Sequence, residues 1–247
     1  MNTPPKPAAE RYFYFIATAL LLVLTVIGFQ LFYFHGQAYP GRPLTPPIKN
    51  LVITHGLAMS LWMLLALVQP FLVASGNRRL HMMVGRGAAV IAVGLVVLGF
   101  RLGVASASVA PPGQMFGPLT PKQFMAVPLL SVVLFAFFVA LGVLCWKRPE
   151  IHRPAMFMAS MTAVGAAIAR IVFLNHLYAG TVWQKIFGDL FFSVVIAGLF
   201  LLAKCVVFRK FDPWFAAGVL VLTVWCLMIV QGAPTPVWDA IASLLLR

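Results

Sequence analysis

The chain has 247 residues, of which 62% are hydrophobic and only 9% are charged, and its mean hydropathy is +0.98. A soluble domain carries about 25% charged residues to cover its surface, so this composition excludes a soluble globular protein. The net charge of +13 does not by itself indicate nucleic acid, because basic residues gather on the cytoplasmic side of multi-span membrane proteins.

The apolar segments are close to the length at which a helix crosses a bilayer, about 20 residues, and they do not alternate as barrel strands do. Lipid offers the backbone no hydrogen-bond partners, which favours helices throughout. We therefore predict an all-α polytopic membrane bundle over 12–231. Its seven expected transmembrane helices are 12–34, 50–75, 80–104, 124–146, 152–176, 185–208 and 213–231.

Two tails flank the predicted bundle. Residues 1–11 read as a short cytoplasmic tail before a retained first span, because no cleavage site for a signal peptide follows. Residues 232–247 are expected to form an interfacial helix with Trp238 at the headgroup level. Within the fifth span, alanines recur every fourth residue, from Ala155 to Ala167. Such a stripe lets a neighbouring backbone come close, so this helix is expected to be central.

Orientation follows from the lysines and arginines in and beside the loops. One side holds eleven of them: Lys6, Arg11, Arg78, Arg79, Arg86, Lys147, Arg148, Arg153, Lys204, Arg209 and Lys210. The other holds seven: Arg42, Lys49, Arg101, Lys122, Arg170, Lys185 and Arg247. This distribution predicts a bacterial inner-membrane protein with a cytoplasmic N-terminus and a periplasmic C-terminus.

Ionisable side chains inside a bilayer are costly and therefore point to function. An outer layer of them is expected at the ends of several spans, comprising His55, Arg101, Arg170, His176 and Asp189. Asp189 is the only acid within any predicted span, and its expected partner is Arg101 or Arg170, since a lone carboxylate there would protonate. A structural ion pair with snorkelling arginines is the alternative to a functional layer.

An inner layer comprises His81, in RRLHMMVGR, and His152, in RPEIHRPAM. Each begins an odd-numbered span and precedes an arginine, with 20 residues from His81 to Arg101 and 18 from His152 to Arg170. At about 1.5 Å per residue each arginine lies roughly 27–30 Å from its histidine. The two hairpins therefore resemble copies of one unit, and internal repeats often place a site at their interface. Residues in a basic loop that face headgroups are the alternative.

Several chemistries are open to these histidines. Pairs at matching depth, His81 with His152 and His55 with His176, could ligate the iron of haem b, with arginines on its propionates. A quinone head group is a second candidate, because His, Arg and Asp can hydrogen-bond its carbonyls. A copper site from His152 and neighbouring methionines is a weaker alternative. No Ser-His-Asp set, HExxH motif or Walker loop is present, and the three cysteines form no CxxC motif.

An ordered series of short motifs carries a family resemblance. The motifs are His-Gly (His55, Gly56), Gln69, LHxxxGR (Leu80, His81, Gly85, Arg86), HRxxM (His152, Arg153, Met156) and Ala169-Arg170. Over 50–177 the chain resembles an uncharacterised family of bacterial multi-pass membrane proteins, known only as a domain of unknown function. The resemblance implies that His55, His81, His152 and Arg170 matter, without naming a reaction. In architecture alone, the chain is distantly similar to cytochrome b-type membrane electron carriers.

Together these patterns predict an inner-membrane redox protein that binds haem b, a quinone or both through His55, His81, His152 and His176. It would carry electrons alone or as a subunit, with the bilayer, other membrane subunits or a redox protein as partners. The alternative is a non-enzymatic membrane protein, either a small-molecule carrier or a structural or assembly subunit of a larger complex.

Overall fold

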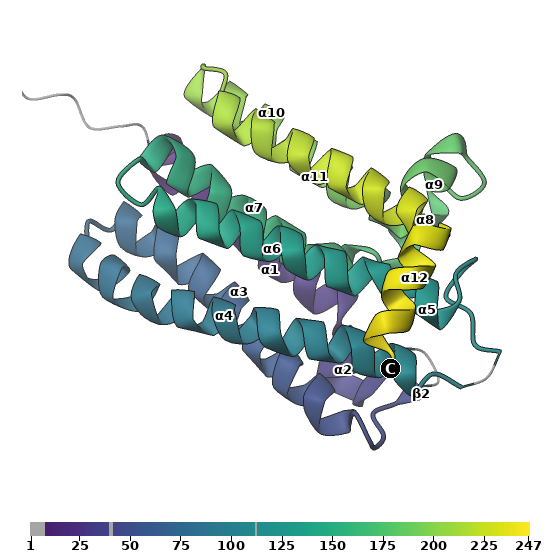
Figure 1. Ribbon diagram of the computed structural model, residues 1–247. Helices are drawn as coiled ribbons and strands as arrows, with labels where there is room; N and C mark the ends of the chain where they lie inside the picture. Colours follow the sequence, from purple (N-terminus) through teal and green to yellow (C-terminus); the bar gives the residue numbers. More distant parts are fainter. Residues whose placement is uncertain (1–7, 40–41, 112) are drawn as a thin grey trace, which may run out of the picture.

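A bundle of long helices forms the protein in the computed structural model, which describes residues 8–39, 42–111 and 113–247 (Figure 1). Its long helices are α1 (Ala8–Gly28), α3 (Lys49–Ala74), α4 (Arg78–Ser108), α6 (Ala126–Leu144), α7 (Pro149–Ile168), α10 (Phe191–Phe208) and α11 (Pro213–Gly232). The predicted all-α polytopic bundle is therefore confirmed.

Six helical segments of the described chain are long and apolar enough to cross a membrane, and α7 is the long helix that is not among them. The first turns of α7 carry Glu150, His152 and Arg153, which lower its hydropathy. The helix is instead enclosed by protein, since it packs against α1, α3, α6, α10 and α11. The central place expected for this segment is confirmed.

The alanine stripe of α7 allows the close contact that its spacing predicts. Ala159 and Ala167 are fully buried. Gly28 of α1 lies so near α7 that a Cβ atom there would be 2.1 Å from the carbonyl oxygen of Ala167. The backbones of α1 and α7 therefore touch at this point, which only a glycine permits.

Short elements interrupt three of the predicted spans, 12–34, 152–176 and 185–208. They are α2 (Gln30–His35), α8 (Val172–His176), α9 (Val182–Phe187) and the 3-10 helix η1 (Gly188–Leu190). The sixth span breaks at Gly188, whose φ of 51° favours glycine. The fifth ends at Ile168, where the Asn175 side-chain amide donates to the Ala169 carbonyl at 2.8 Å. The spans 12–34 and 152–176 were predicted too long, whereas 185–208 falls within Val182–Phe208, a segment long enough to cross a membrane despite the break at Gly188.

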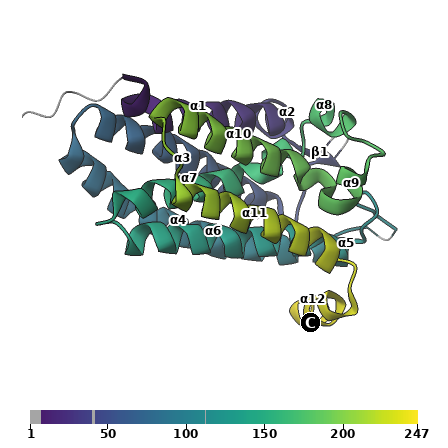
Figure 2. The same cartoon turned by 90° about the horizontal axis from the view of Figure 1, so that it is seen from above.

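The remaining short elements are the hairpin β1 (Gln37–Tyr39) and β2 (Arg42–Pro43), α5 (Pro121–Phe124) and α12 (Pro236–Leu245). The predicted helix in 232–247 is present as α12, which lies beside α5 (Figure 2). Only 7% of Trp238 is exposed, and its Nε1 donates to the Lys122 carbonyl at 3.0 Å. The side chain packs against α5 and α6, while its level relative to lipid headgroups stays a prediction.

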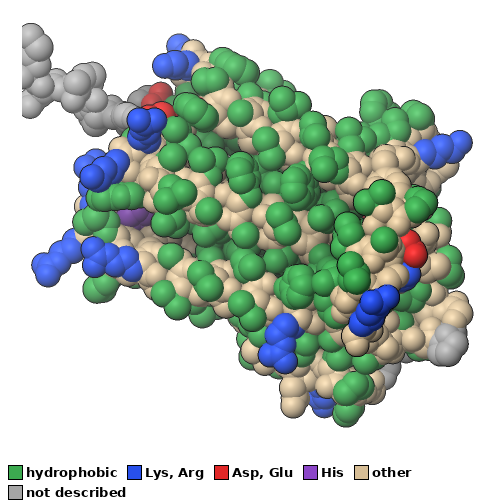
Figure 3. All heavy atoms as spheres, in the orientation of Figure 1, with side chains coloured by type: hydrophobic (Ala, Val, Ile, Leu, Met, Phe, Trp, Pro, Cys, Tyr) green, Lys and Arg blue, Asp and Glu red, His purple; other side chains and the backbone are tan. Residues whose placement is uncertain are grey.

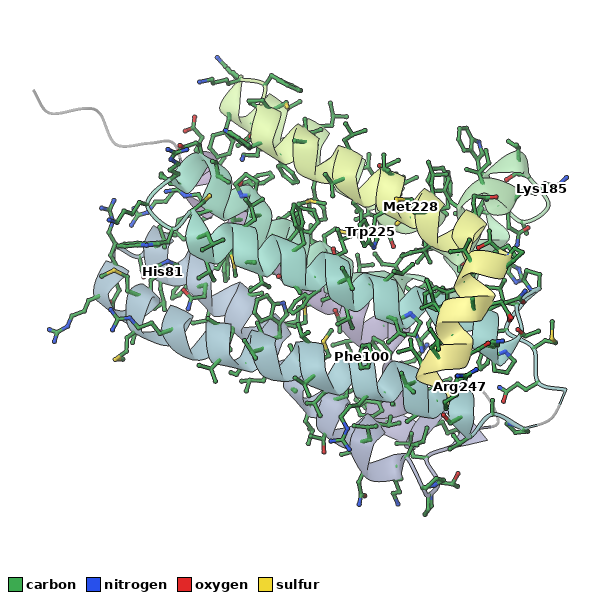
Figure 4. The ribbon with its side chains drawn as sticks, in the orientation of Figure 1. His81, Phe100, Lys185, Trp225, Met228 and Arg247 are labelled. Atoms are coloured by element: carbon green, nitrogen blue, oxygen red, sulfur yellow. The ribbon has the colours of Figure 1, made fainter. Side chains whose placement is uncertain are left out.

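Two ends of the bundle are used below. The histidine end is where α1, α4, α7 and α11 begin and where His81 lies, at the left of Figure 4. The α12 end is the opposite one. On the face that Figure 3 shows, hydrophobic side chains cover most of the surface between the two ends, while lysine and arginine side chains gather toward the ends. This distribution suits a protein that crosses a bilayer along the bundle axis.

Candidate functional site

Gln69, near the end of α3, connects this helix to the start of α4. With its amide oxygen turned toward α4, Gln69 accepts from the Gly85 N–H at 2.9 Å. Its amide nitrogen then donates to the His81 carbonyl oxygen at 3.2 Å and to His81 Nδ1. This orientation satisfies both ends of the amide, whereas the reverse one would place donors against donors. Gln69, His81 and Gly85 thus form one hydrogen-bonded unit.

His152, in the first turn of α7, is held by the end of α6. The last carbonyl groups of a helix have no partner within it, and Gly142 lies among them. His152 Nδ1 lies 2.8 Å from the Gly142 carbonyl oxygen. Since a carbonyl only accepts, Nδ1 of His152 carries a proton. A Cβ atom at Gly142 would lie 2.5 Å from Met156 Sδ, so the glycine lets α6 approach α7 at the same place.

The two imidazole rings meet at the histidine end. The ring centroids of His81 and His152 are 6.3 Å apart, and the ring planes are at 89°. His152 donates through Nδ1, so its Nε2 is an acceptor in the neutral form. His81 accepts at Nδ1 from Gln69, so its Nε2 carries the proton. No side-chain hydrogen bond occupies either Nε2 in the described residues, and the backbone of Gln69 adds a further interaction with the His81 ring. In these tautomers the pair has one Nε2 donor and one Nε2 acceptor.

Positive charge surrounds this pair. Arg153 follows His152 in α7, and its charge acts on His81 and also on Tyr14 and Lys204. The side chain of Arg11 donates to the Ala74 carbonyl at the end of α3. Histidine atoms show at this end as a recessed patch between lysine and arginine side chains (Figure 3). The pair is therefore half-buried beneath a basic rim.

His55, predicted in the outer layer, lies on the first half of α3. A Cβ atom on Gly99 of α4 would be 3.5 Å from His55 Cε1 and 2.6 Å from a methyl group of Val132 on α6. His55 therefore points between α4 and α6. Its Nδ1 is buried without a hydrogen-bond partner among the described residues. No ring contact or hydrogen bond joins it to His176, which is exposed on α8, so the predicted second histidine pair does not form in the described structure.

The other predicted outer-layer residues are dispersed. Arg170 donates to the Ala166 carbonyl at 2.7 Å and stacks over the Phe29 ring at 4.8 Å. Arg101 is exposed on α4. The ion pairs among the described residues are Lys122 with Asp239 and Lys204 with Asp212, so the expected pairing of Asp189 with Arg101 or Arg170 is wrong. Asp189 lies on η1, and none of the ion pairs of the described residues includes it.

A buried cluster around Lys204 was missed at the sequence level, where this residue counted only as loop charge. Lys204, on α10, is 6% exposed and pairs with Asp212. It also donates to the Tyr14 hydroxyl and lies over the rings of Tyr14 and Phe215. Asp212 in turn accepts from the Phe215 N–H at 2.8 Å, capping α11. The cluster joins α1, α10 and α11 at the histidine end.

Metal and haem sites can be tested against this geometry. In the described residues no group of three or more His, Cys, Asp or Glu side chains could hold a metal ion. The methionines considered for copper diverge, since Met156 faces Gly142 of α6 and Met158 faces Gly218 of α11. For haem b, His152 has the free Nε2 that an axial ligand needs. His81 carries its proton on that nitrogen, so the pair fits a hydrogen-bonded ligand better than iron.

Comparisons with protein-family models, curated proteins and solved structures found no match to this chain.

Proposed function

We propose that the protein is a membrane redox protein that binds a quinone at the histidine end. The observation that carries this proposal is the meeting of His81 and His152, with ring centroids 6.3 Å apart and opposite hydrogen-bonding roles. The two roles are imposed by Gln69 and Gly142 on separate helices, which holds each imidazole in one tautomer.

A quinone head group requires this combination. Its carbonyl oxygens accept hydrogen bonds, and the hydroxyl groups of the reduced quinol donate them. The His81 Nε2–H can donate to a carbonyl, while His152 Nε2 can accept from a hydroxyl. When a quinol is oxidised it releases two protons and two electrons, and an imidazole is the side chain best suited to accept a proton near neutral pH. The electrons would pass to a redox partner or another subunit.

The proposal extends to the membrane and the orientation. The protein would lie in a bacterial inner membrane with the histidine end in the cytoplasm, because eleven lysines and arginines fall on that side and seven on the other. A periplasmic reporter enzyme fused to the C-terminus should then be active, and the same fusion at the N-terminus should not.

The test is a binding titration of the purified protein in mild detergent with a short-chain benzoquinone, together with mass spectrometry of co-purified lipids. The wild type should bind the quinone. Because each substitution removes one hydrogen bond, His81→Ala and His152→Ala should each weaken binding by about 5- to 30-fold. His176→Ala is the matched control and should bind as the wild type does.

Three results would overturn this proposal. The first is a loss of quinone affinity in His176→Ala equal to that in the other two variants. The second is an unchanged quinone affinity in both His81→Ala and His152→Ala. The third is a Soret band that shifts on reduction and disappears in His81→Ala, which would establish haem ligation. A protein that binds neither quinone nor haem would support a carrier or structural subunit instead.

A further inference from the structure

A groove at the α12 end has a mostly apolar lining and contains none of the residues on which the quinone proposal rests. It encloses about 510 Å³ between the start of α3, the last turns of α4 and the end of α12. Its apolar wall includes Ile48, Leu51, Phe100, Val104 and Leu245. Figure 4 shows Phe100 on α4 with Arg247 nearby at the end of α12. The groove opens onto the outer surface of the bundle, where lipid would lie.

One face of α4 supplies both the positive charge of the groove and much of its floor. Arg101, Val104, Ala105 and Ser108 all line the groove and follow the i, i+3, i+4, i+7 spacing of a single helix face. The Ser108 hydroxyl is already used, since it donates to the Val104 carbonyl at 3.1 Å. Arg101 is thus the group in the groove wall that can bind an anion.

The spacing of two exposed arginines on α4 suits the level of lipid phosphates. Fifteen residues separate Arg86 from Arg101, which is about 22 Å along the helix axis. Arginine side chains near the ends of a membrane helix extend toward the headgroups, so this pair could bracket a hydrocarbon core of about 30 Å. With Arg86 at one interface, the guanidinium of Arg101 would lie near the other.

The positive charge of Arg101 in the groove has no acidic side chain beside it in the groove wall. No aspartate or glutamate lines the groove, and the ion pairs of the described chain, Lys122 with Asp239 and Lys204 with Asp212, leave Arg101 out. A guanidinium binds a phosphate through two parallel hydrogen bonds, which makes arginine a strong phosphate ligand.

We propose that this groove binds an anionic phospholipid. Its phosphate would lie on Arg101, and an acyl chain would pack along Leu51, Phe100 and Val104. An open, mostly apolar groove with one cation in its wall suits such an amphiphile better than a compact polar ligand. The site is separate from the histidine pair, because Arg101 is 20 residues beyond His81 on α4, about 30 Å away.

The experiment counts lipid bound to the delipidated, purified protein by native mass spectrometry, with phosphatidylglycerol and phosphatidylcholine offered separately. Phosphatidylglycerol should bind more tightly. Arg101→Gln removes the phosphate ligand and should weaken its binding by about tenfold. Ala105→Phe fills the floor of the groove without changing charge and should also weaken binding. Arg79→Gln, which removes an exposed arginine at the histidine end, is the matched control.

The site is confirmed if both groove variants lose phosphatidylglycerol while the Arg79 variant keeps it. It is overturned if Arg101→Gln binds this lipid as the wild type does, or if Arg79→Gln loses as much. Equal binding of phosphatidylcholine, which carries the same phosphate together with a choline cation, would show that the groove does not select an anionic lipid and would overturn the proposal. Unchanged binding in Ala105→Phe would show that the lipid lies elsewhere.

Discussion

Among the residues that the structure describes, each end of the bundle holds one ion pair, and the two pairs differ in their surroundings. At the histidine end Lys204 and Asp212 are enclosed, with side chains that are 8% and 19% exposed. At the α12 end Lys122 and Asp239 are 32% and 59% exposed. The neighbouring polar residues differ less sharply. His81 and His152 are held by other helices. At the α12 end Arg170 and Asn175 bond to carbonyls within six residues of themselves, but Gln231 and Trp238 donate to carbonyls of distant elements.

The contrast indicates where a binding site can be built. A site needs groups held in fixed positions by several elements, because loosely held groups lose affinity when they must be ordered on binding. Four helices converge on the histidine pair, since α3 holds His81 of α4 and α6 holds His152 of α7. At the α12 end the side chains of Gln231 and Trp238 hold neighbouring loops and short helices in place. Arg101, on α4, is the residue there for which we propose lipid binding.

The largest expected difference between the ends concerns the free energy of unfolding. Lys204→Met leaves the Asp212 carboxylate enclosed without its cation and should destabilise the protein by about 3–5 kcal/mol. Lys122→Met breaks an exposed pair of the same residue types and should cost about 0–1 kcal/mol. Thermal unfolding of both variants in the same detergent measures the difference.

A double variant separates charge from packing in this comparison. Lys204→Met with Asp212→Asn removes the uncompensated carboxylate while keeping a side chain that can cap α11. It should recover part of the stability that the single variant loses. If Lys204→Met and Lys122→Met unfold at the same temperature, the enclosure of the pair has no energetic consequence and the contrast between the two ends is lost.

A smaller effect is expected on quinone binding. Gln69→Leu removes the amide that holds the tautomer of His81, so affinity for a short-chain benzoquinone should fall by about fivefold. Arg170→Gln, at the α12 end, should leave the affinity unchanged. The titration used for the histidine variants measures both. Equal losses of quinone affinity in Gln69→Leu and Arg170→Gln would mean that the quinone does not bind specifically at the histidine end.

A carboxylate at residue 69 sharpens the same prediction. In Gln69→Glu the new side chain can only accept, so His81 Nδ1 must carry a proton and its Nε2 becomes an acceptor. Quinone binding should weaken, while the pair gains the free nitrogens that haem iron needs. Expression of this variant with added haem, followed by an absorption spectrum, tests the change. Tighter quinone binding in Gln69→Glu would contradict the assigned tautomer.

Much of the helical core follows from sequence because its causes are local. Apolar length predicts the long helices, and the alanine spacing predicts the burial of α7. The basic turns predict that His81 and His152 lie at one depth, which places them near each other once the hairpins pack. The breaks at Ile168 and Gly188 were missed, because hydropathy continues through them and the deciding contacts come from Asn175 and the backbone.

Contacts between distant residues explain the other misses. Lys204 lies beside a basic loop, and nothing in its neighbourhood indicates that Tyr14, 190 residues earlier, will approach it. The hydrogen bond from Trp238 Nε1 to the Lys122 carbonyl, 116 residues away in sequence, could not be predicted either. The tautomers of His81 and His152 depend likewise on Gln69 and Gly142. Candidate residues could be predicted, but their hydrogen-bonding roles could not.

The smallest predicted effect is a titration at the α12 end. Tyr178 donates to the Gly188 carbonyl at 2.8 Å, and burial, with a smaller effect from the negative charge of Asp189, raises its pKa from 10.0 to about 12. The folded protein thus favours the neutral phenol. The resulting stability is present below pH 10.0 and is lost as the pH rises toward about 12. Asp189→Asn should lower the pKa of Tyr178 while leaving it above 10.0, because burial remains.

Tyrosinate absorbance as a function of pH, taken as the difference between each protein and its Tyr178→Phe counterpart, measures this pKa. Asp239→Asn is the matched control at the same end, because Asp239 pairs with Lys122 and does not contribute to the shift of Tyr178. A fall in the pKa of Tyr178 in both variants would show that the electrostatic field of all the charges at this end acts on its hydroxyl. A fall in Asp189→Asn alone would show that charges there act on their own neighbours, in contrast to Arg153, whose charge reaches both clusters at the histidine end.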